Sequence, residues 1–139
     1  MKKTTSLICV FAIVLLCLAS CNPPTSSGTA TIVIGTETPS EYTLEFKDGD
    51  ITDGLLSALD LLEIEYVEDG GMLSSVGDLS PTGSTYIWIY TSVDADKDVT
   101  AYATTMEYNG VQLTSTGKGA KTMSIVDGAI IYIGTISFG

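Results

Sequence analysis

The sequence predicts an α+β fold in which one helix packs on a mostly antiparallel or mixed β-sheet. Apolar and polar residues alternate with a period of two in several short segments, which is typical of strands with one buried face. Only the segment at about residues 52–62 places its leucines three and four residues apart, as a helix with one apolar face does. Glycine-containing turn dipeptides separate the strand candidates.

The first predicted elements are two strands and the helix that follows them. Residues 29–34 and 42–47 alternate apolar with mostly polar side chains, and Thr36 to Ser40 forms the loop of a β-hairpin between them. A turn at Asp48 to Asp53 leads into the helix. Either Thr52 or Asp53 is expected to cap the helix, because a side-chain oxygen can accept the free backbone N–H groups of the first turn.

The rest of the chain is predicted to be strands. The candidates are residues 64–67, 72–76, 86–90, 100–108, 111–114, 121–126 and 129–138. Gly70-Gly71 breaks the chain between the first two of them. Asn109-Gly110 and Asp127-Gly128 each favour a two-residue hairpin turn, so we expect hairpins at both places.

The first twenty residues have the pattern of a bacterial lipoprotein signal peptide. Lys2 and Lys3 precede an apolar run from Leu7 to Ala19, which is too short to span a bilayer. Leu18, Ala19 and Ser20 lead directly into Cys21, so we expect lipidation of Cys21 and cleavage before it, with ordinary secretion as the alternative. The predicted organisation is a signal peptide at 1–20, a lipidated cysteine and polar tether at 21–28, and a single domain at 29–139.

This organisation places the domain on the extracytoplasmic side of a membrane in the cell envelope, held by its lipid. Cys9 and Cys17 lie within the signal, so the mature chain keeps only Cys21 and no disulfide is expected. The 119 residues that remain suit one domain with a core of its own.

Composition excludes several functions. After cleavage the chain carries four lysines against 17 acidic residues, a net charge of −13, and it has no arginine or histidine. Nucleic-acid binding is therefore excluded, since it requires clustered basic residues. A Ser-His-Asp triad, a Cys-His pair and an imidazole zinc site all need residues that are missing. We therefore expect a non-enzymatic protein without a cofactor.

An acidic segment at Asp94-Ala95-Asp96-Lys97-Asp98 begins like a calcium-binding EF-hand loop. The pattern fails further on, because Val99 stands where glycine is needed and Thr105 where the closing glutamate belongs. The segment is interpreted as a solvated loop, with a looser extracellular-type calcium site as the alternative, and no metal-binding residue is predicted.

The order of these motifs resembles one family. The motifs are Gly49-Asp50 with Thr52, the leucine-rich helix, Gly71 before a short strand, Tyr86-Ile87-Trp88-Ile89-Tyr90-Thr91, Asn109-Gly110, Gly119 and Asp127-Gly128. From Ala30 to Ser137 the chain is similar to the transcobalamin C-terminal-like domain, which bacteria carry widely in lipoproteins and surface proteins. The resemblance implies a β-grasp-like fold and a domain that closes over one face of a corrinoid. The chain departs from that family in lacking a helical partner domain and a histidine to ligate cobalt, and its spacing from Thr52 to Leu59 is longer.

Three aromatic residues form the candidate ligand-binding site. Tyr86, Trp88 and Tyr90 share one face of their strand, and such a stripe either fills the core or stacks against a flat ligand or a protein partner. The sequence therefore predicts a lipid-anchored binding module for a corrinoid, another small flat ligand or an envelope protein. The alternative is a structural or adhesion lipoprotein that engages other envelope or surface proteins through its strand edges.

Overall fold

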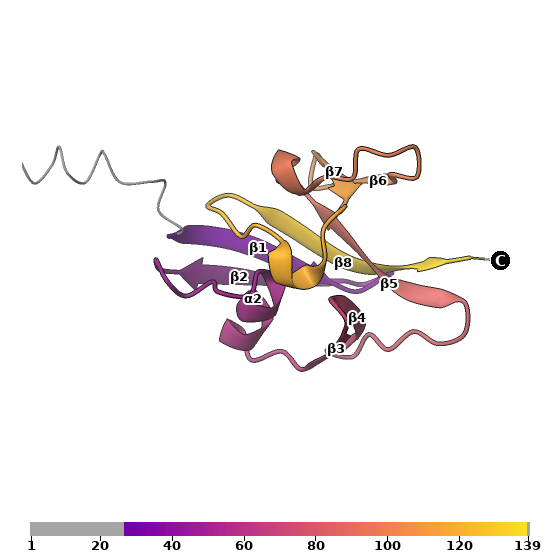
Figure 1. Ribbon diagram of the computed structural model, residues 1–139, viewed down its shortest axis with the longest axis horizontal. Helices are drawn as coiled ribbons and strands as arrows, with labels where there is room; N and C mark the ends of the chain where they lie inside the picture. The colour runs from indigo at the N-terminus through magenta and orange to yellow at the C-terminus, as the bar shows by residue number, and fades with distance from the viewer. Residues whose placement is uncertain (1–26, 139) are drawn as a thin grey trace, which may run out of the picture.

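The computed structural model describes residues 27–138, which form a mixed six-stranded sheet, a two-stranded sheet and one short α-helix (Figure 1). The elements are β1 (Gly28–Ile34), β2 (Ser40–Phe46), α2 (Leu55–Leu61), β3 (Tyr66–Asp69), β4 (Met72–Val76), β5 (Thr85–Thr91), β6 (Thr105–Tyr108), β7 (Val111–Ser115) and β8 (Ile130–Ser137). Short 3₁₀ turns lie at Asp94–Asp96 and Ala120–Thr122. The predicted α+β class is confirmed.

The large sheet has the order β2-β1-β8-β5-β7-β6, in which β1 and β8 are parallel and the other neighbours are antiparallel. The predicted first hairpin is β1–β2, and it is confirmed. The predicted hairpin at Asp127-Gly128 is wrong. Residues 121–126 form no strand, because Met123 and Ile125 turn into the core beside α2, and both edges of β8 are already occupied by β1 and β5.

The helix was placed correctly, but its predicted cap is wrong. It begins at Leu55, and Gly54 is its N-cap residue with φ 54° and no side-chain cap. The hydroxyl of Ser57 instead accepts the backbone N–H groups of Thr52 and Asp53 at 3.1 and 2.7 Å. A Cβ at Gly54 would lie 2.6 Å from the carbonyl oxygen of Ala120, so this close approach of two backbones requires glycine at the helix entry.

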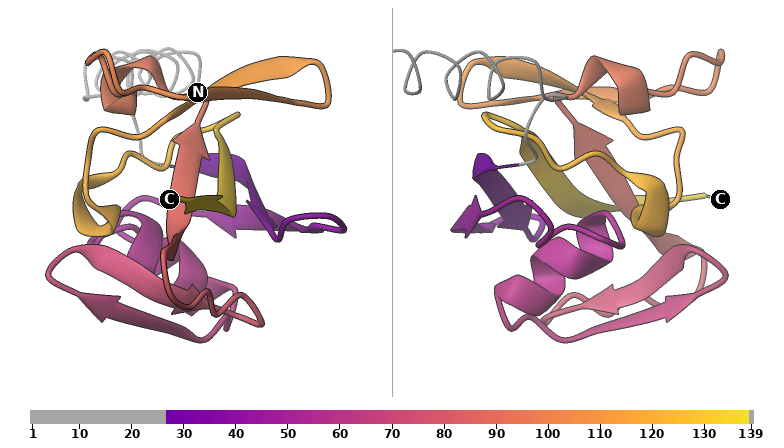
Figure 2. Two further views of the ribbon diagram at one scale, coloured as in Figure 1. Left: turned by 90° about the vertical axis from the view of Figure 1, so that its right-hand side faces the viewer. Right: turned by 60° about the vertical axis from the view of Figure 1, so that its left-hand side comes forward.

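One face of the large sheet carries the main core. Helix α2 and the β3–β4 sheet cover that face, on the side away from β6 and β7 (Figures 1 and 2). The core combines alternate residues of the strands with the helix, among them Ile32, Leu44, Leu55, Leu59, Leu73, Val76, Ile87, Ile131 and Ile133. The apolar residues that recur every two positions in the sequence therefore lie on the buried face of each strand.

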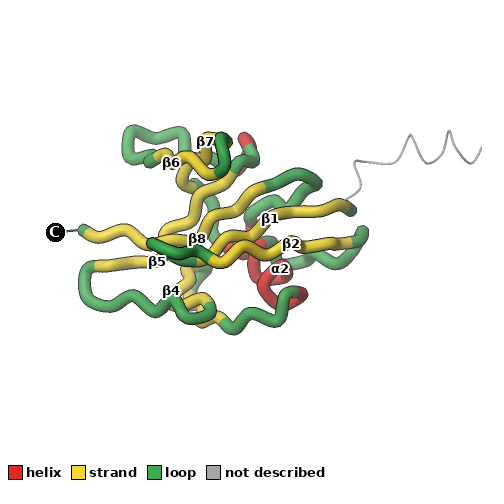
Figure 3. The backbone as a smooth tube through the Cα atoms, turned by 180° about the vertical axis from the view of Figure 1, so that it is seen from behind, coloured by secondary structure: helices red, strands yellow, loops and turns green. Residues whose placement is uncertain are grey.

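The β6–β7 hairpin covers part of the opposite face. It pairs with β5 only at Tyr90 and Thr91. Figure 3 shows it on the side of the sheet away from α2, and its Tyr108 reaches Glu41 of β2. Its Leu113 packs with Val33 and Tyr132 in a second, smaller core cluster. The predicted Asn109-Gly110 turn is confirmed, with φ values of 49° and 79°. The strand expected at 100–108 is shorter than predicted, since only Thr105–Tyr108 pairs.

The predicted signal peptide and Cys21 lie outside the described residues, as does most of the predicted tether. The described part of the chain holds no helix long and apolar enough to cross a bilayer. Strand β1 begins at Gly28, the last residue assigned to the tether.

Candidate functional site

The three predicted aromatic residues lie on β5, on the face opposite the main core, but they have different surroundings. Tyr90 is half-buried in the second core cluster, where its ring meets that of Tyr132 edge-on at 6.4 Å between centroids. Because the β6–β7 hairpin packs on this cluster, Tyr90 belongs to the core rather than to a surface. The structure therefore does not present the three rings as one continuous exposed stripe.

Trp88 lies at the boundary between core and solvent. It is half-buried, and its indole N–H donates a hydrogen bond of 2.9 Å to the hydroxyl of Thr104. Its ring meets Phe138 edge-on at 5.8 Å and an interplanar angle of 76°. The hydrogen bond and the ring contact fix the orientation of the indole, so that its remaining exposed part is a rigid surface.

Two exposed aromatic residues, Tyr86 and Phe138, have ring contacts in this region, and they are 47% and 52% exposed. Their centroids lie 5.9 Å apart, and both belong to the same face of the sheet as Trp88. We call Tyr86, Trp88 and Phe138 the aromatic rim. Phe138 was not singled out from the sequence, because only the pairing of β8 with β5 brings the end of the last strand beside Tyr86.

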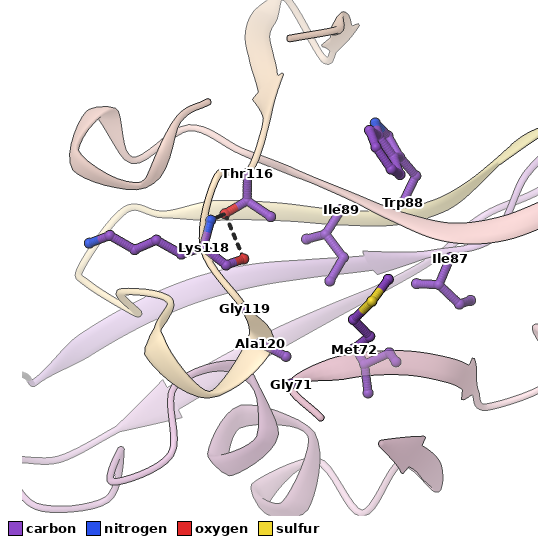
Figure 4. A pocket seen from close by; sticks show the side chains of 10 residues that line it. Gly71, Met72, Ile87, Trp88, Ile89, Thr116, Lys118, Gly119 and Ala120 are labelled. Atoms are coloured by element: carbon purple, nitrogen blue, oxygen red, sulfur yellow. Dashed lines mark hydrogen bonds between the residues drawn. The ribbon is translucent and has the colours of Figure 1, made fainter. Parts of the chain in front are cut away.

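A small cavity lies beside Trp88, next to the part of β5 that does not pair with β7. Its volume is about 120 Å³, and its walls come from the start of β4, the middle of β5 and the segment after β7 (Figure 4). The lining residues are Gly71, Met72, Leu73, Ile87, Trp88, Ile89, Thr116, Lys118, Gly119 and Ala120. Figure 4 shows Met72 reaching between Ile87 and Ile89, while Trp88 points to the other side of the strand. No local pattern in the sequence indicates this cavity, because residues far apart in the chain form it.

A buried carboxylate supports the wall of this cavity. The Asp96 side chain accepts the backbone N–H of Ser124 at 2.5 Å and forms an ion pair with Lys118 at 3.0 Å. The backbone carbonyl oxygen of Asp96 accepts hydrogen bonds from the N–H of Gly117 and from the hydroxyl of Thr116. Asp96 therefore fixes the segment that lines the cavity opposite β4. The Asp94 carboxylate is bonded to Lys97 at 2.8 Å, which holds the pKa of Asp94 below its usual value.

The charges of the described residues are mostly negative, and the one charged residue that lines the cavity, Lys118, is paired with Asp96. Residues 27–138 contain four lysines and 17 acidic residues. Three of those lysines, Lys97, Lys118 and Lys121, already lie within 4.0 Å of a carboxylate. Among the same residues, no group of three or more His, Cys, Asp or Glu side chains is arranged to hold a metal ion. The overall charge of the domain therefore favours apolar or cationic ligands over anions.

Two tyrosine hydroxyls on the hairpin side of the sheet have perturbed acidity. Tyr108 donates a hydrogen bond to the carboxylate of Glu41 on β2, and that bond raises the pKa of Tyr108 above its ordinary value. Burial raises the pKa of Tyr132. Both hydroxyls are therefore protonated at neutral pH. The hydrogen bond of Tyr108 to Glu41 and its ring contact with Tyr132, at 5.6 Å between centroids, hold the β6–β7 hairpin against the sheet.

No known protein family and no curated protein sequence matches the chain. The site therefore has to be interpreted from its own residues.

Proposed function

We propose that this protein is a lipid-anchored, extracytoplasmic binding module that performs no chemistry of its own and contacts a flat, largely apolar ligand through the aromatic rim. The observation that carries the proposal is the exposure of Tyr86 and Phe138 beside the fixed ring of Trp88. Exposed rings that are already oriented lose little conformational freedom when a ligand stacks on them.

The location rests on the sequence before the domain. Leu18, Ala19 and Ser20 precede Cys21, and the few residues from there to β1 suit a tether between lipid and fold. Changing Cys21 to Ala should abolish incorporation of labelled palmitate and release the protein from the membrane fraction. Retention of the variant in membranes would contradict lipid anchoring through this residue.

The resemblance to the transcobalamin C-terminal-like domain adds a fold and a ligand class to the proposal. A mixed sheet with one helix on its core face supports a β-grasp-like arrangement. A corrinoid is the ligand that the resemblance implies. The cavity of about 120 Å³ is too small for it, since small-molecule pockets usually measure about 300–1,000 Å³. The residues therefore fit only a corrinoid that lies across the open rim, without a histidine ligand to cobalt.

The test uses the single tryptophan of the chain, Trp88, whose ring belongs to the rim and also lines the adjoining cavity. Dicyanocobinamide and planar aromatic dyes are titrated against the full chain, with binding followed by Trp88 fluorescence and by calorimetry. The change Tyr86→Ala should weaken a rim ligand by about fivefold, the equivalent of about 1 kcal/mol of ring contact. The matched control is Tyr102→Ala, since Tyr102 is 86% exposed and lies outside the rim. Equal affinities for both variants would contradict the proposal.

The second candidate is a structural or adhesion protein of the envelope, and the edge of the large sheet favours it. Within residues 27–138, the seven-residue strand β2 pairs only with β1, so its outer edge is open. An open edge of this length can add a strand from another protein. Stable capture of an envelope protein that is lost on Thr43→Pro, while Trp88 fluorescence stays unchanged, would favour this function over ligand binding.

A further inference from the structure

A second hollow continues the small cavity along β5. It has a volume of about 370 Å³ and is lined by the β3–β4 sheet, the loop at 81–83 and the start of β5. The two hollows share Met72, Leu73 and Ile87. We call the combined space the β4–β5 slot. It runs between one edge of β5 and β4, which belongs to the other sheet.

The backbone of β5 faces this slot without a neighbouring strand. Within the described residues, β7 pairs only with Tyr90 and Thr91, whereas β8 pairs with all of β5 on the other side. The carbonyl oxygen of Ile89 accepts the N–H of Thr116 at 2.9 Å, so Ile89 faces the β7 side. Residues two apart in a strand direct their backbone groups to the same side, and those of Ile87 therefore face the slot.

The slot has one closed end and two kinds of side wall. It closes where the N–H of Ala120 donates to the carbonyl of Gly71 at 3.1 Å, and it opens toward the loop at 81–83. Leu73 and Ile87 are buried on the core side, and the aromatic rim begins on the other side. Met72 lies over the slot and is 66% exposed, so its flexible side chain can move without disturbing the core.

These features match what an extended peptide requires. A strand added to β5 hydrogen-bonds to the free backbone of Ile87 and directs alternate side chains toward Leu73 and toward Trp88. The chemistry of the peptide follows from charge. The domain carries 17 acidic residues against four lysines. The charged residues that line the slot are Asp69 and Lys118, and Lys118 is paired with the buried Asp96. Basic residues at the ends of the peptide are therefore attracted, whereas acidic residues are repelled.

We propose that the β4–β5 slot binds an extended segment of a partner protein, apolar at alternate positions and flanked by lysine or arginine, which adds to the edge of β5. This site goes beyond the flat ligand proposed for the aromatic rim, because backbone hydrogen bonds rather than ring stacking select its occupant. The two sites meet at Tyr86 and Trp88.

The test uses the full chain in phosphatidylcholine nanodiscs, whose neutral lipid does not attract basic peptides. The probe is a peptide of about eight residues that alternates valine and threonine between terminal lysines. Binding should protect the amide of Ile87 from hydrogen exchange, as measured by NMR. A proline at the centre of the peptide, or glutamates in place of its lysines, should weaken binding by about tenfold or more.

Two variants of equal charge locate the site. Met72→Arg places a cation at the slot and should weaken the peptide by about tenfold. Val67→Arg adds the same charge on exposed β3, outside the slot, and should have little effect. The proposal is overturned if both variants bind alike, if the proline peptide binds as well as its parent, or if Ile87 becomes protected only through self-association at high protein concentration. Phe138 belongs to the rim and does not line the slot. Loss of rim ligands on Phe138→Ala, with peptide binding retained, therefore separates failure of this site from failure of the proposed function.

Discussion

Replacing Asp96 tests how the cavity wall is held. The buried carboxylate accepts two hydrogen bonds from Ser124, at 2.5 Å from the backbone N–H and 3.2 Å from the hydroxyl. A hydrogen bond to a charged group contributes about 1.5–3 kcal/mol, and the longer of the two is weaker. The change Asp96→Ala removes both and leaves the half-buried N–H of Ser124 without its acceptor. We expect the free energy of unfolding to fall by about 3 kcal/mol.

The ion pair with Lys118 should contribute much less. The Lys118 side chain is 42% exposed, so solvent screens its charge, and Ser124 still donates to the carboxylate when the lysine is gone. We expect Lys118→Ala to cost about 1 kcal/mol or less. Asp96→Asn should lie between the two alanine variants, because its amide oxygen can still accept the N–H of Ser124.

Equilibrium urea unfolding, followed by Trp88 fluorescence and by circular dichroism, measures these differences. Asp94→Ala is the matched control. Asp94 is an exposed acidic residue with its own lysine partner, and its loss should change stability by less than about 0.5 kcal/mol. If Lys118→Ala destabilises as much as Asp96→Ala, the charge pair rather than the hydrogen bonds holds the wall, and the reasoning is refuted.

Three further changes test other parts of the structure. Thr104→Val removes the acceptor of the Trp88 indole and should cost about 1 kcal/mol in urea unfolding, whereas an unchanged stability would show that the indole exchanges this bond for water. Gly54→Ala places a Cβ against the carbonyl of Ala120 and should cost more than about 1 kcal/mol, with loss of helical circular dichroism; a stable variant would contradict the close approach at the helix entry. Glu41→Gln should lower the pKa of Tyr108 toward its ordinary value in an NMR titration. Because the folded-state pKa of Tyr108 is raised, its contact with Glu41 stabilises the protein below the unfolded-state pKa and is lost as pH rises through the folded-state pKa. A Tyr108 pKa that Glu41→Gln leaves unchanged would contradict the hydrogen bond.

Most elements of the fold could be predicted from local pattern. The β1–β2 hairpin, the helix and the Asn109-Gly110 turn each follow from residues close in sequence. The prediction of a hairpin at Asp127-Gly128 was wrong, because the same turn residues also suit a bend before a strand that pairs with distant segments, here β1 and β5. There the carboxylate of Asp127 accepts the N–H of Thr29, and β8 enters the middle of the sheet. Local pattern cannot show which strands become neighbours.

The candidate site divides in the same way. The aromatic period of β5 is a property of the sequence, and it placed Tyr86, Trp88 and Tyr90 on one face. Which of these rings lies in the core depends on the β6–β7 hairpin, which leaves β5 after Tyr90 and packs on the sheet there. Phe138 joins the rim because β8 pairs with β5 along its whole length.

The sequence by itself determined the α+β class, the excess of acidic residues and the lack of histidine and arginine, because these depend on composition and on contacts between near neighbours. Tertiary structure alone decided that β5 has a covered half and an open half. That division arises from the pairing of β7 with only two residues of β5 and from the approach of β4 in another sheet. Such long-range pairing is selected by the packing of the whole core. The rim and the slot lie along the part of β5 that β7 does not pair with.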